Sequence, residues 1–380
     1  MELLKCGVGI DMAMQKFDAC FSVIDTEQRV TVKATRQFEN NPKGFVSFLE
    51  WVKKHSKQPL PVVFLVEASG VYHEQLAWYL YRQDQAITII LPNKAKRYKE
   101  ALGIHSKTDK LDAKALAQMV CEQRLKLWQP VSKSIYRLRT ITRQIERITN
   151  HITSFQNQLH ALEHGMFREK MVEKLVFNNI ALLEKQKEQL IAAIETMIKG
   201  DAELNERYEQ ISAIKGIGLL TYAVLVAETD GFALIENQSQ LVSYAGYDVI
   251  ENQSGKHTGK TKISKKGNSH IRRALHLPAF NAVRCEQKPF STLYERVFEN
   301  SKIKMKAYTA VQKKLLILVY TLWKKKEAYQ PNYVLEISKE DELVSLFRLK
   351  KNSPKPCLGL HKMNIHRSIA VCSLSVGTKI

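Results

Sequence analysis

The chain lacks the features that would place it in a membrane or a secretory pathway. No apolar run approaches the roughly 18 residues that a membrane span needs. The N-terminal residues show no basic stretch followed by a long apolar segment, so we expect no secretory signal. The six cysteines are scattered and include no CxxC pair, which argues against a zinc site or a disulfide framework. These absences favour a protein of the reducing cytoplasm with no membrane partner.

Acidic residues are also scarce relative to basic ones. The chain has 58 Lys and Arg against 38 Asp and Glu, a net charge of +20. Such an excess attracts polyanions, of which nucleic acid is the commonest inside a cell. The alternative is a basic protein that stays soluble through self-repulsion. Clustering of the charge favours nucleic acid, because residues 252–285 hold eight basic and no acidic residues.

The first part of the chain alternates strand and helix patterns. Short apolar or alternating runs predict strands at 5–10, 17–24, 30–38, 61–67 and 86–91. Helical patterns begin at Pro42 and cover about 72–83, 93–102 and 109–122. Three strands with hairpin links followed by alternating helices and strands predict a mixed α/β sheet, which we assign to a domain of residues 1–127.

The rest of the chain predicts mainly helices. Residues 135–162 carry an apolar residue every three or four positions, and a second helix pattern covers 169–199. This favours a coiled-coil helical hairpin in a linker of residues 128–205, with an ordinary hairpin of no oligomeric role as the alternative. Residues 206–348 form a mainly helical C-terminal domain with helices over 269–286 and 303–327. Residues 349–380 lose periodicity and are expected to form an irregular tail.

Two segments of the C-terminal domain have the composition of phosphate-binding elements. Gly216 and Gly218 lie in a turn between two helix patterns at 211–230, similar to a helix-hairpin-helix, in which backbone N–H groups can hold a phosphate. A plain helix turn is the alternative. Residues 253–268 form a loop rich in Gly, Ser, Thr and Lys, which we expect to be mobile without a ligand. Tyr244 and Tyr247 could stack on bases, with core packing as the alternative.

Four carboxylates occupy positions that suit a metal site. Asp11 closes the first predicted strand and Glu67 the fourth, while Asp109 and Asp112 lie three apart near a helix start. Ligands gather at the carboxyl ends of strands in α/β sheets, so all four could meet there. Clustered carboxylates suit Mg²⁺, or Mn²⁺ as an alternative, and a pair of such ions can clamp a phosphodiester. Taken singly, each has a structural alternative, such as capping a helix or turn.

Basic side chains accompany both regions. Lys107, Lys110 and Lys114 surround the second carboxylate pair and suit a DNA backbone. The second group lies in and after the loop, where we expect contacts to phosphates that position the nucleic acid without reading its sequence. These residues are Lys256, Lys260, Lys262, Lys265, Lys266, Arg272 and Arg273.

The motifs together resemble a known family. The segments GIDMAMQKFDAC, VEASGVYHEQLAWYL and KTDKLDAKALAQ resemble the DEDD motifs of the RuvC-like transposases that include the Piv site-specific invertases. Downstream, IKGIGLLTYAVLVAE and YAGYDVIENQSGKHTGKTKISKKGNSHIRRAL are similar to the C-terminal transposase domain of that family. The resemblance covers roughly residues 5–300, with both halves in the family's order. The residues after about Leu349 have no counterpart in it.

The resemblance implies a fold and a chemistry. It implies a ribonuclease H-like N-terminal domain with Asp11, Glu67, Asp109 and Asp112 as metal ligands. It also implies that Ser254 attacks a DNA phosphate and forms a phosphoserine link, so that strands can be rejoined without ATP. The residues alone leave this role open, because Ser264 and Ser269 are rivals and a hydroxyl that only binds phosphate is the default.

The implied partners are donor and target double-stranded DNA, a structured non-coding guide RNA and further copies of the chain, in a prokaryotic cytoplasm. The first hypothesis is therefore an insertion-sequence transposase or recombinase that uses the serine and a Mg²⁺ site. The second is a junction resolvase-like nuclease that uses the same carboxylates with water as the nucleophile. The third is a non-catalytic nucleic-acid-binding protein.

Overall fold

The computed structural model describes residues 2–56, 59–104, 106, 108–233, 235–255, 257–259 and 261–330. The expected tail of residues 349–380 lies outside these ranges, as do Lys107, Lys256 and Lys260. Residues Met1–Ala328 form one compact unit. None of the helices in the described ranges is long and apolar enough to cross a membrane.

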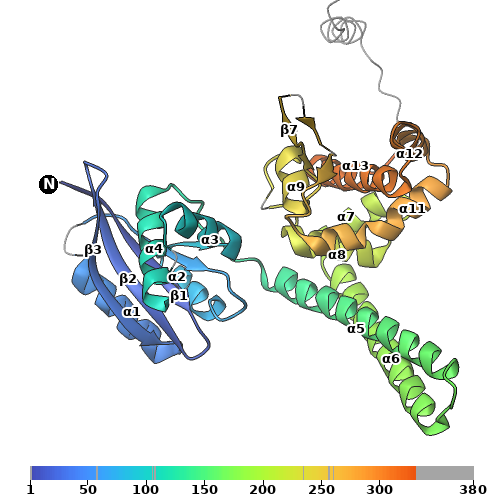
Figure 1. Cartoon of the computed structure of the whole chain (residues 1–380), viewed down its shortest axis with the longest axis horizontal. Helices are drawn as coiled ribbons and strands as arrows, with labels where there is room; N and C mark the ends of the chain where they lie inside the picture. The colour runs from blue at the N-terminus through green and yellow to red at the C-terminus, as the bar shows by residue number, and fades with distance from the viewer. Residues whose placement is uncertain are drawn as a thin grey trace, which may run out of the picture. The chain divides into compact units, whose positions relative to one another are not determined.

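The N-terminal part is built on a mixed five-stranded sheet (Figure 1). Its strands are β1 (Leu3–Met12), β2 (Lys16–Asp25), β3 (Val30–Glu39), β4 (Val62–Glu67) and β5 (Ala86–Ile90). Their order is β3-β2-β1-β4-β5, in which β1 to β3 are antiparallel and β4 and β5 run parallel to β1. All five strands were expected from the sequence, although β1 begins and ends two residues beyond the predicted run.

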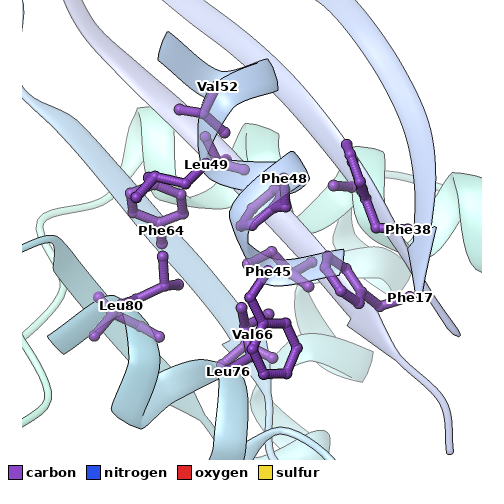
Figure 2. Close-up of a cluster of buried hydrophobic side chains, with 14 of the residues drawn as sticks. Phe17, Phe38, Phe45, Phe48, Leu49, Val52, Phe64, Val66, Leu76 and Leu80 are labelled. Atoms are coloured by element: carbon purple, nitrogen blue, oxygen red, sulfur yellow. The ribbon is translucent and has the colours of Figure 1, made fainter. Parts of the chain in front are cut away.

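Helices α1 (Pro42–His55) and α2 (Glu74–Arg82) cover one face of the sheet. Figure 2 shows the aromatic core beneath α1, in which Phe48 lies close to Phe17 and Phe64. Asn41 caps α1 by accepting a hydrogen bond from the N–H of Gly44 at 2.8 Å. Alternating strand residues such as Val8 and Ile10 point into this core and are fully buried.

Helix α4 (Asp109–Glu122) packs on the opposite face, next to α3 (Pro92–Ala101). Its small residues Ala113 and Ala117 are buried and face β1 and β2. The approach is close because β1 presents Gly7 and Gly9 there. A Cβ atom on Gly9 would lie 2.1 Å from the backbone nitrogen of Ala117 and 2.2 Å from the carbonyl oxygen of Ala113. Only glycine therefore allows this spacing between helix and strand.

Two long helices form the predicted hairpin. Helix α5 (Lys133–Glu163) and helix α6 (Lys170–Lys199) run side by side and antiparallel in Figure 1. Ile148 and Ile152 of α5 are buried against Val176 and Ile180 of α6. This confirms a packed helical hairpin, whereas its role as an oligomeric coiled coil stays a prediction.

The remaining part is mainly helical, as expected. Its helices are α7 (Ala202–Ser212), α8 (Leu219–Thr229), α9 (Gln238–Ala245), α10 (Ser269–Ala274), α11 (His276–Arg284), α12 (Lys288–Ser301) and α13 (Lys304–Lys325). The single helix expected over 269–286 is wrong, because the chain breaks at Leu275 into α10 and α11. Leu275 is fully buried, so the break packs an apolar side chain into the core.

The region expected as a plain loop contains short paired strands. Strands β6 (Val249–Ile250) and β9 (Lys262–Ile263) pair antiparallel at the two ends of this region, and we call this strand pair its frame. Between them, β7 (Gln253–Ser254) pairs with β8 (His257–Thr258), with a turn at Gly255 (φ +55°). We call residues 249–263 the serine loop, because they carry Ser254.

We predict that Gly9→Ala destabilises the N-terminal part, because the added methyl group must push α4 away from β1. The expected loss is about 1–3 kcal/mol or more, the range for an overpacked core, measured as a lower midpoint in urea unfolding. Gly165→Ala is the matched control, since a Cβ at Gly165 would meet no atom closer than 3.4 Å. Equal midpoints for the two variants would contradict the packing argument.

Candidate active site

Strand alternation places Asp11 on the face covered by α4. Gly7 and Gly9 both face α4, and Asp11 follows at the next position of the same period. Asp11 is therefore directed to the side of the sheet where α4 begins, near the carboxyl end of β1. Its side chain is mostly buried.

The same alternation applies to β4. Val63 and Leu65 belong to the apolar cluster that includes α4, and Glu67 follows two residues later as the last residue of β4. The residues just before Asp11 and Glu67 are paired in the parallel register of β1 and β4. The two carboxylates thus lie at adjacent strand ends, as the sequence predicted.

Helix α4 contributes the second pair from its first turn. Thr108 is the N-cap and accepts a hydrogen bond from the N–H of Leu111 at 3.3 Å, so Asp109 is not the cap. Asp109 is exposed, whereas Asp112, one turn later, is only 8% exposed. Acidic groups in the first turn of a helix interact favourably with the helix dipole. This interaction does not require a buried side chain, so it does not explain the burial of Asp112.

All four carboxylates line one cavity of about 690 Å³. Burial, reinforced by Asp112, Asp109 and Glu67, raises the pKa of Asp11 from 3.8 to about 7, and Lys99 partly opposes the rise. Lys99 also forms an ion pair with Asp112 at 2.9 Å. At neutral pH the cavity therefore holds more carboxylates than its cations balance, and Asp11 relieves the repulsion by keeping a proton part of the time.

The donor chemistry of this cavity fits a hard divalent cation, since carboxylate oxygens are what such ions prefer. The geometry is more open than the sequence led us to expect. Within the described ranges, no three His, Cys, Asp or Glu side chains already form a group that could hold a metal ion. The four carboxylates thus surround a shared cavity without forming a closed coordination shell.

Ser254 lies elsewhere in the sequence, on β7, and is exposed. The side chain of His257, its partner across the β7–β8 pair, is outside the described part of the chain. The rival Ser264 accepts a hydrogen bond from the N–H of Lys266 at 3.3 Å. Ser254 is therefore open to an approaching phosphate, while Ser264 has a role in the local turn.

The sequence-predicted basic residues divide into exposed and structural ones. Exposed side chains that remain candidates for phosphate contacts are Lys110, Lys114, Lys262, Lys265 and Lys266, while Arg273 is exposed but ion-paired with Glu146. Arg272 has a structural role as well, because its guanidinium donates to the carbonyl oxygens of Ala245 (2.6 Å) and Lys265 (3.3 Å). It thus links Lys265, just after the serine loop, to the end of α9.

The glycine turn is also partly explained by packing. Gly216 has φ +102°, and a Cβ there would lie 2.8 Å from the carbonyl oxygen of Pro278 in α11. Gly218 meets nothing within 4 Å and is the N-cap of α8. Only Gly218 thus keeps open space beside a helix start, while Gly216 is required by the fold. The helix-hairpin-helix role of the pair stays a prediction.

A buried ionic network anchors the beginning of α10, just after the serine loop. Glu228 of α8 is 2% exposed and accepts two hydrogen bonds from Arg143 of α5, at 2.8 and 2.9 Å. It also accepts one from Asn268, the N-cap of α10, at 2.7 Å. Burial alone would raise the pKa of Glu228, but the Arg143 and Asn268 hydrogen bonds outweigh it and the pKa is lowered.

A second acidic residue extends this network. Glu146 of α5 pairs with Arg273 and lies 2.5 Å from Nδ1 of His270, both on α10. Helix α10 is therefore held to α5 by Glu146 directly and to α8 by Glu228. Tyr244 donates its hydroxyl to the Glu228 carbonyl oxygen at 2.7 Å, and Tyr247 is 1% exposed. Core packing, the alternative to base stacking, is correct for Tyr247.

Sequence reasoning missed Lys99 and Glu228. Lys99 could have been suspected only as part of a generally basic helix, because its partner Asp112 is on a different helix. Glu228 had a visible signal, since it continues directly from the apolar run LLTYAVLVA. A carboxylate in such a position is buried only when it is paired.

We predict that Asp11→Asn stabilises the metal-free protein at pH 8 and has little effect near pH 4. The pKa of Asp11 is about 7 when folded against 3.8 ordinarily, so the folded state holds a proton that the unfolded state releases. Wild-type stability should therefore fall as pH rises from about 4 to 7, by at most about 1.4 kcal/mol per pH unit. Thermal unfolding with EDTA across this range measures it.

Glu188→Gln on the exposed surface of α6 is the control and should show the wild-type profile. Adding Mg²⁺ should raise the unfolding temperature of the wild type more than that of Asp11→Asn. Parallel pH profiles for wild type and Asp11→Asn would contradict the pKa assignment.

We predict that Glu228→Ala lowers the free energy of unfolding by about 1–3 kcal/mol, since charged hydrogen bonds to Arg143 and Asn268 are lost. Because the pKa of Glu228 is lowered in the folded state, the difference from wild type should shrink as pH falls below the ordinary carboxyl range. Glu195→Ala, which removes the exposed pair with Lys199, should change stability by less than about 1 kcal/mol. A cost for Glu228→Ala no larger than the control's would refute the anchoring role.

The chain matches two transposase family models. Residues 8–167 match the DEDD transposase model of the IS110 type, and residues 208–295 match the model described as "Transposase IS116/IS110/IS902 family". The first match contains all four carboxylates, and the second contains Ser254 and the predicted basic residues downstream of it.

Curated relatives are similar over most of the chain. The pilin gene-inverting protein of Moraxella bovis is 30% identical over 84% of this chain and 95% of its own length. The transposase for insertion sequence element IS1111A of Coxiella burnetii is 22% identical over 70% of this chain and 75% of its own length.

Among solved structures, Thermus thermophilus RuvC in complex with a Holliday junction substrate aligns with 32% of this chain and 99% of its own, at 10% identity and a TM-score of 0.25. A TM-score this low does not establish a shared fold. The sequence relatives are sufficient, because they span both halves of the chain: the protein belongs to the IS110 family of DEDD transposases and DNA-inverting recombinases.

Proposed function

We propose that this transposase cuts and rejoins DNA through a covalent phosphoserine intermediate on Ser254, assisted by a divalent cation at the carboxylate cavity. The observation that carries the proposal is the convergence of Asp11, Glu67, Asp109 and Asp112 on one cavity. The protein is a recombinase by family membership, and this cavity is where its four predicted metal-binding carboxylates lie. The sheet order β3-β2-β1-β4-β5 supports the ribonuclease H-like interpretation of the domain.

In the proposed reaction, the Ser254 hydroxyl attacks a DNA phosphate and gives up its proton to a base. A serine–phosphate bond forms, the bond to the leaving sugar oxygen breaks, and that oxygen is protonated. Attack by a sugar hydroxyl of the other strand reverses these events and releases Ser254. One phosphodiester is thus exchanged for another without ATP.

The carboxylates contribute by holding the cation. Asp11, Glu67, Asp109 and Asp112 would bind Mg²⁺, which would supply charge stabilisation for the phosphorane-like transition state. Lys99 keeps Asp112 oriented through its 2.9 Å ion pair while the site is metal-free. Exposed Lys110 and Lys114 on α4 suit the DNA backbone beside the cavity.

Two further partners belong to this proposal. Basic residues cluster in two separate parts of the chain, around α3 and α4 and around the serine loop, which suits DNA together with a structured guide RNA. The helical hairpin exposes large apolar side chains, which suits assembly with further copies of the chain. These side chains are Met166, Phe167, Met171, Leu175, Phe177 and Leu182.

We predict that a denaturing protein gel traps a protein–DNA adduct with the wild type, and that Ser254→Ala and Asp11→Ala both abolish it. The protein with its co-purifying RNA is mixed with Mg²⁺ and DNA that carries the element's junction and target. Ser264→Ala is the matched control and should keep the adduct, because Ser264 only accepts a local hydrogen bond. Ribonuclease treatment before the DNA is added should prevent the adduct if RNA guides the reaction.

Each alternative gives a different gel. Cleaved DNA without an adduct, unchanged in Ser254→Ala but lost in Asp11→Ala, would replace the proposal with a nuclease that uses water. An adduct that survives Ser254→Ala but disappears in Ser264→Ala would move the nucleophile to the rival serine.

A further inference from the structure

A second cavity, lined by none of the four carboxylates, lies beside the serine loop. Its volume is about 1160 Å³, slightly above the roughly 300–1,000 Å³ typical of ligand pockets. The frame of the serine loop forms part of its wall, because Val249 of β6 and Lys262 and Ile263 of β9 all line it. Helices α11, α12 and α13 complete it. A ligand here would therefore lie at the base of the loop that carries Ser254.

The walls of the cavity are unusually apolar for a solvent-exposed surface. Large side chains that line it are open to solvent, with Leu277 71%, Val249 56%, Ile303 56% and Met305 50% exposed. Single exposed apolar residues are common, but a group that shares one cavity indicates a surface covered by a ligand. These exposed aliphatic side chains suit an apolar group that enters the cavity.

Cations surround these apolar walls. Lys262, Lys265, Lys306 and Lys313 line the cavity, and none of the described Asp or Glu residues does so. Such a surface would disfavour an ordinary protein segment with mixed charges, whereas it complements a group flanked by phosphates. A nucleotide combines both properties, because its base is planar and largely apolar on its faces and its backbone is anionic.

The floor of the cavity is polar and ordered. Tyr247 donates its hydroxyl to Oε1 of Gln312 at 2.9 Å, and the Gln312 amide nitrogen lies 3.2 Å from Nδ1 of His276. If the Gln312 amide donates to Nδ1, neutral His276 carries its proton on Nε2 and offers that N–H as a donor. Gln312 and Tyr247 are 5% and 1% exposed, so packing fixes their positions. This floor can hydrogen-bond the edge of a base.

We propose that this cavity receives an unpaired DNA nucleotide next to the strand that Ser254 attacks. The inference rests on the proposed function, since strand exchange requires DNA at the serine loop to leave its duplex. The base would lie between the apolar walls, with its edge toward His276 and Gln312. Its flanking phosphates would contact Lys262, Lys306 and Lys313.

The test measures DNA binding alone. It uses the full chain in EDTA, which removes the cation that the proposed cleavage requires. A DNA duplex with a single 2-aminopurine bulge is compared with the same duplex fully paired, by anisotropy and by acrylamide quenching of the 2-aminopurine. We expect the wild type to prefer the bulged duplex about fivefold or more, and to shield the bulged base from acrylamide.

Leu277→Ser/Met305→Ser removes two exposed wall residues without changing charge. This variant should lose the preference and the shielding, and should keep the affinity for paired DNA, which comes mainly from phosphate contacts. Val46→Ser, at a side chain 47% exposed on α1, is the control and should behave as wild type.

Several outcomes would overturn the proposal. Absence of shielding in the wild type would do so, as would shielding that persists in the double variant. Shielding of the same bulge in RNA but not in DNA would reassign the cavity to RNA. A change in sedimentation of the double variant, with DNA shielding intact, would make it a protein contact. This binding test needs no cleavage. Its outcome is therefore independent of the gel assay for the Ser254 adduct.

Discussion

Close contact between α4 and β1 is the constraint on which the carboxylate cavity depends. Gly7 and Gly9 leave no side chains between the strand and the helix, so Ala113 and Ala117 pack against the strand backbone. The depth of this contact brings the first turn of α4 to the carboxyl end of β1. Asp109 and Asp112 then share a cavity with Asp11 and Glu67, and a helix held farther away would leave the two pairs apart.

The C-terminal part solves a different problem, which is how to hold an exposed loop. The serine loop itself has only two-residue strands, and Ser254 on β7 is exposed. Helix α10, which follows the loop, is by contrast fixed by the Glu228, Arg143 and Asn268 hydrogen bonds and by Glu146. Short strands that precede a firmly held helix suit a nucleophile that must adjust to DNA.

Much of the carboxylate site followed from the sequence, because strand ends and helix starts are local features. Asp11 and Glu67 close two of the predicted strands, and Asp109 begins the helix predicted over about 109–122. Features that depend on pairing between distant elements did not follow. The Lys99–Asp112 pair joins two helices, and the Glu228 network joins three, so no local pattern records either of them. The openness of the carboxylate cavity likewise depends on side-chain geometry, whereas the break at Leu275 has a local signal, because Pro278 has no N–H to donate to the carbonyl oxygen of Ala274.

The anchoring of α10 to α5 has a consequence for how several copies would work together. Helix α5 is one arm of the long hairpin. The same helix contacts α8 through Arg143 and α10 through Glu146. The hairpin and α10 are thus held together, and the serine loop precedes α10 in the chain. If copies associate through their hairpins, the separation between their α10 helices is set by protein geometry before any DNA is bound, and only the serine loops would adjust to the spacing of the exchanged phosphates.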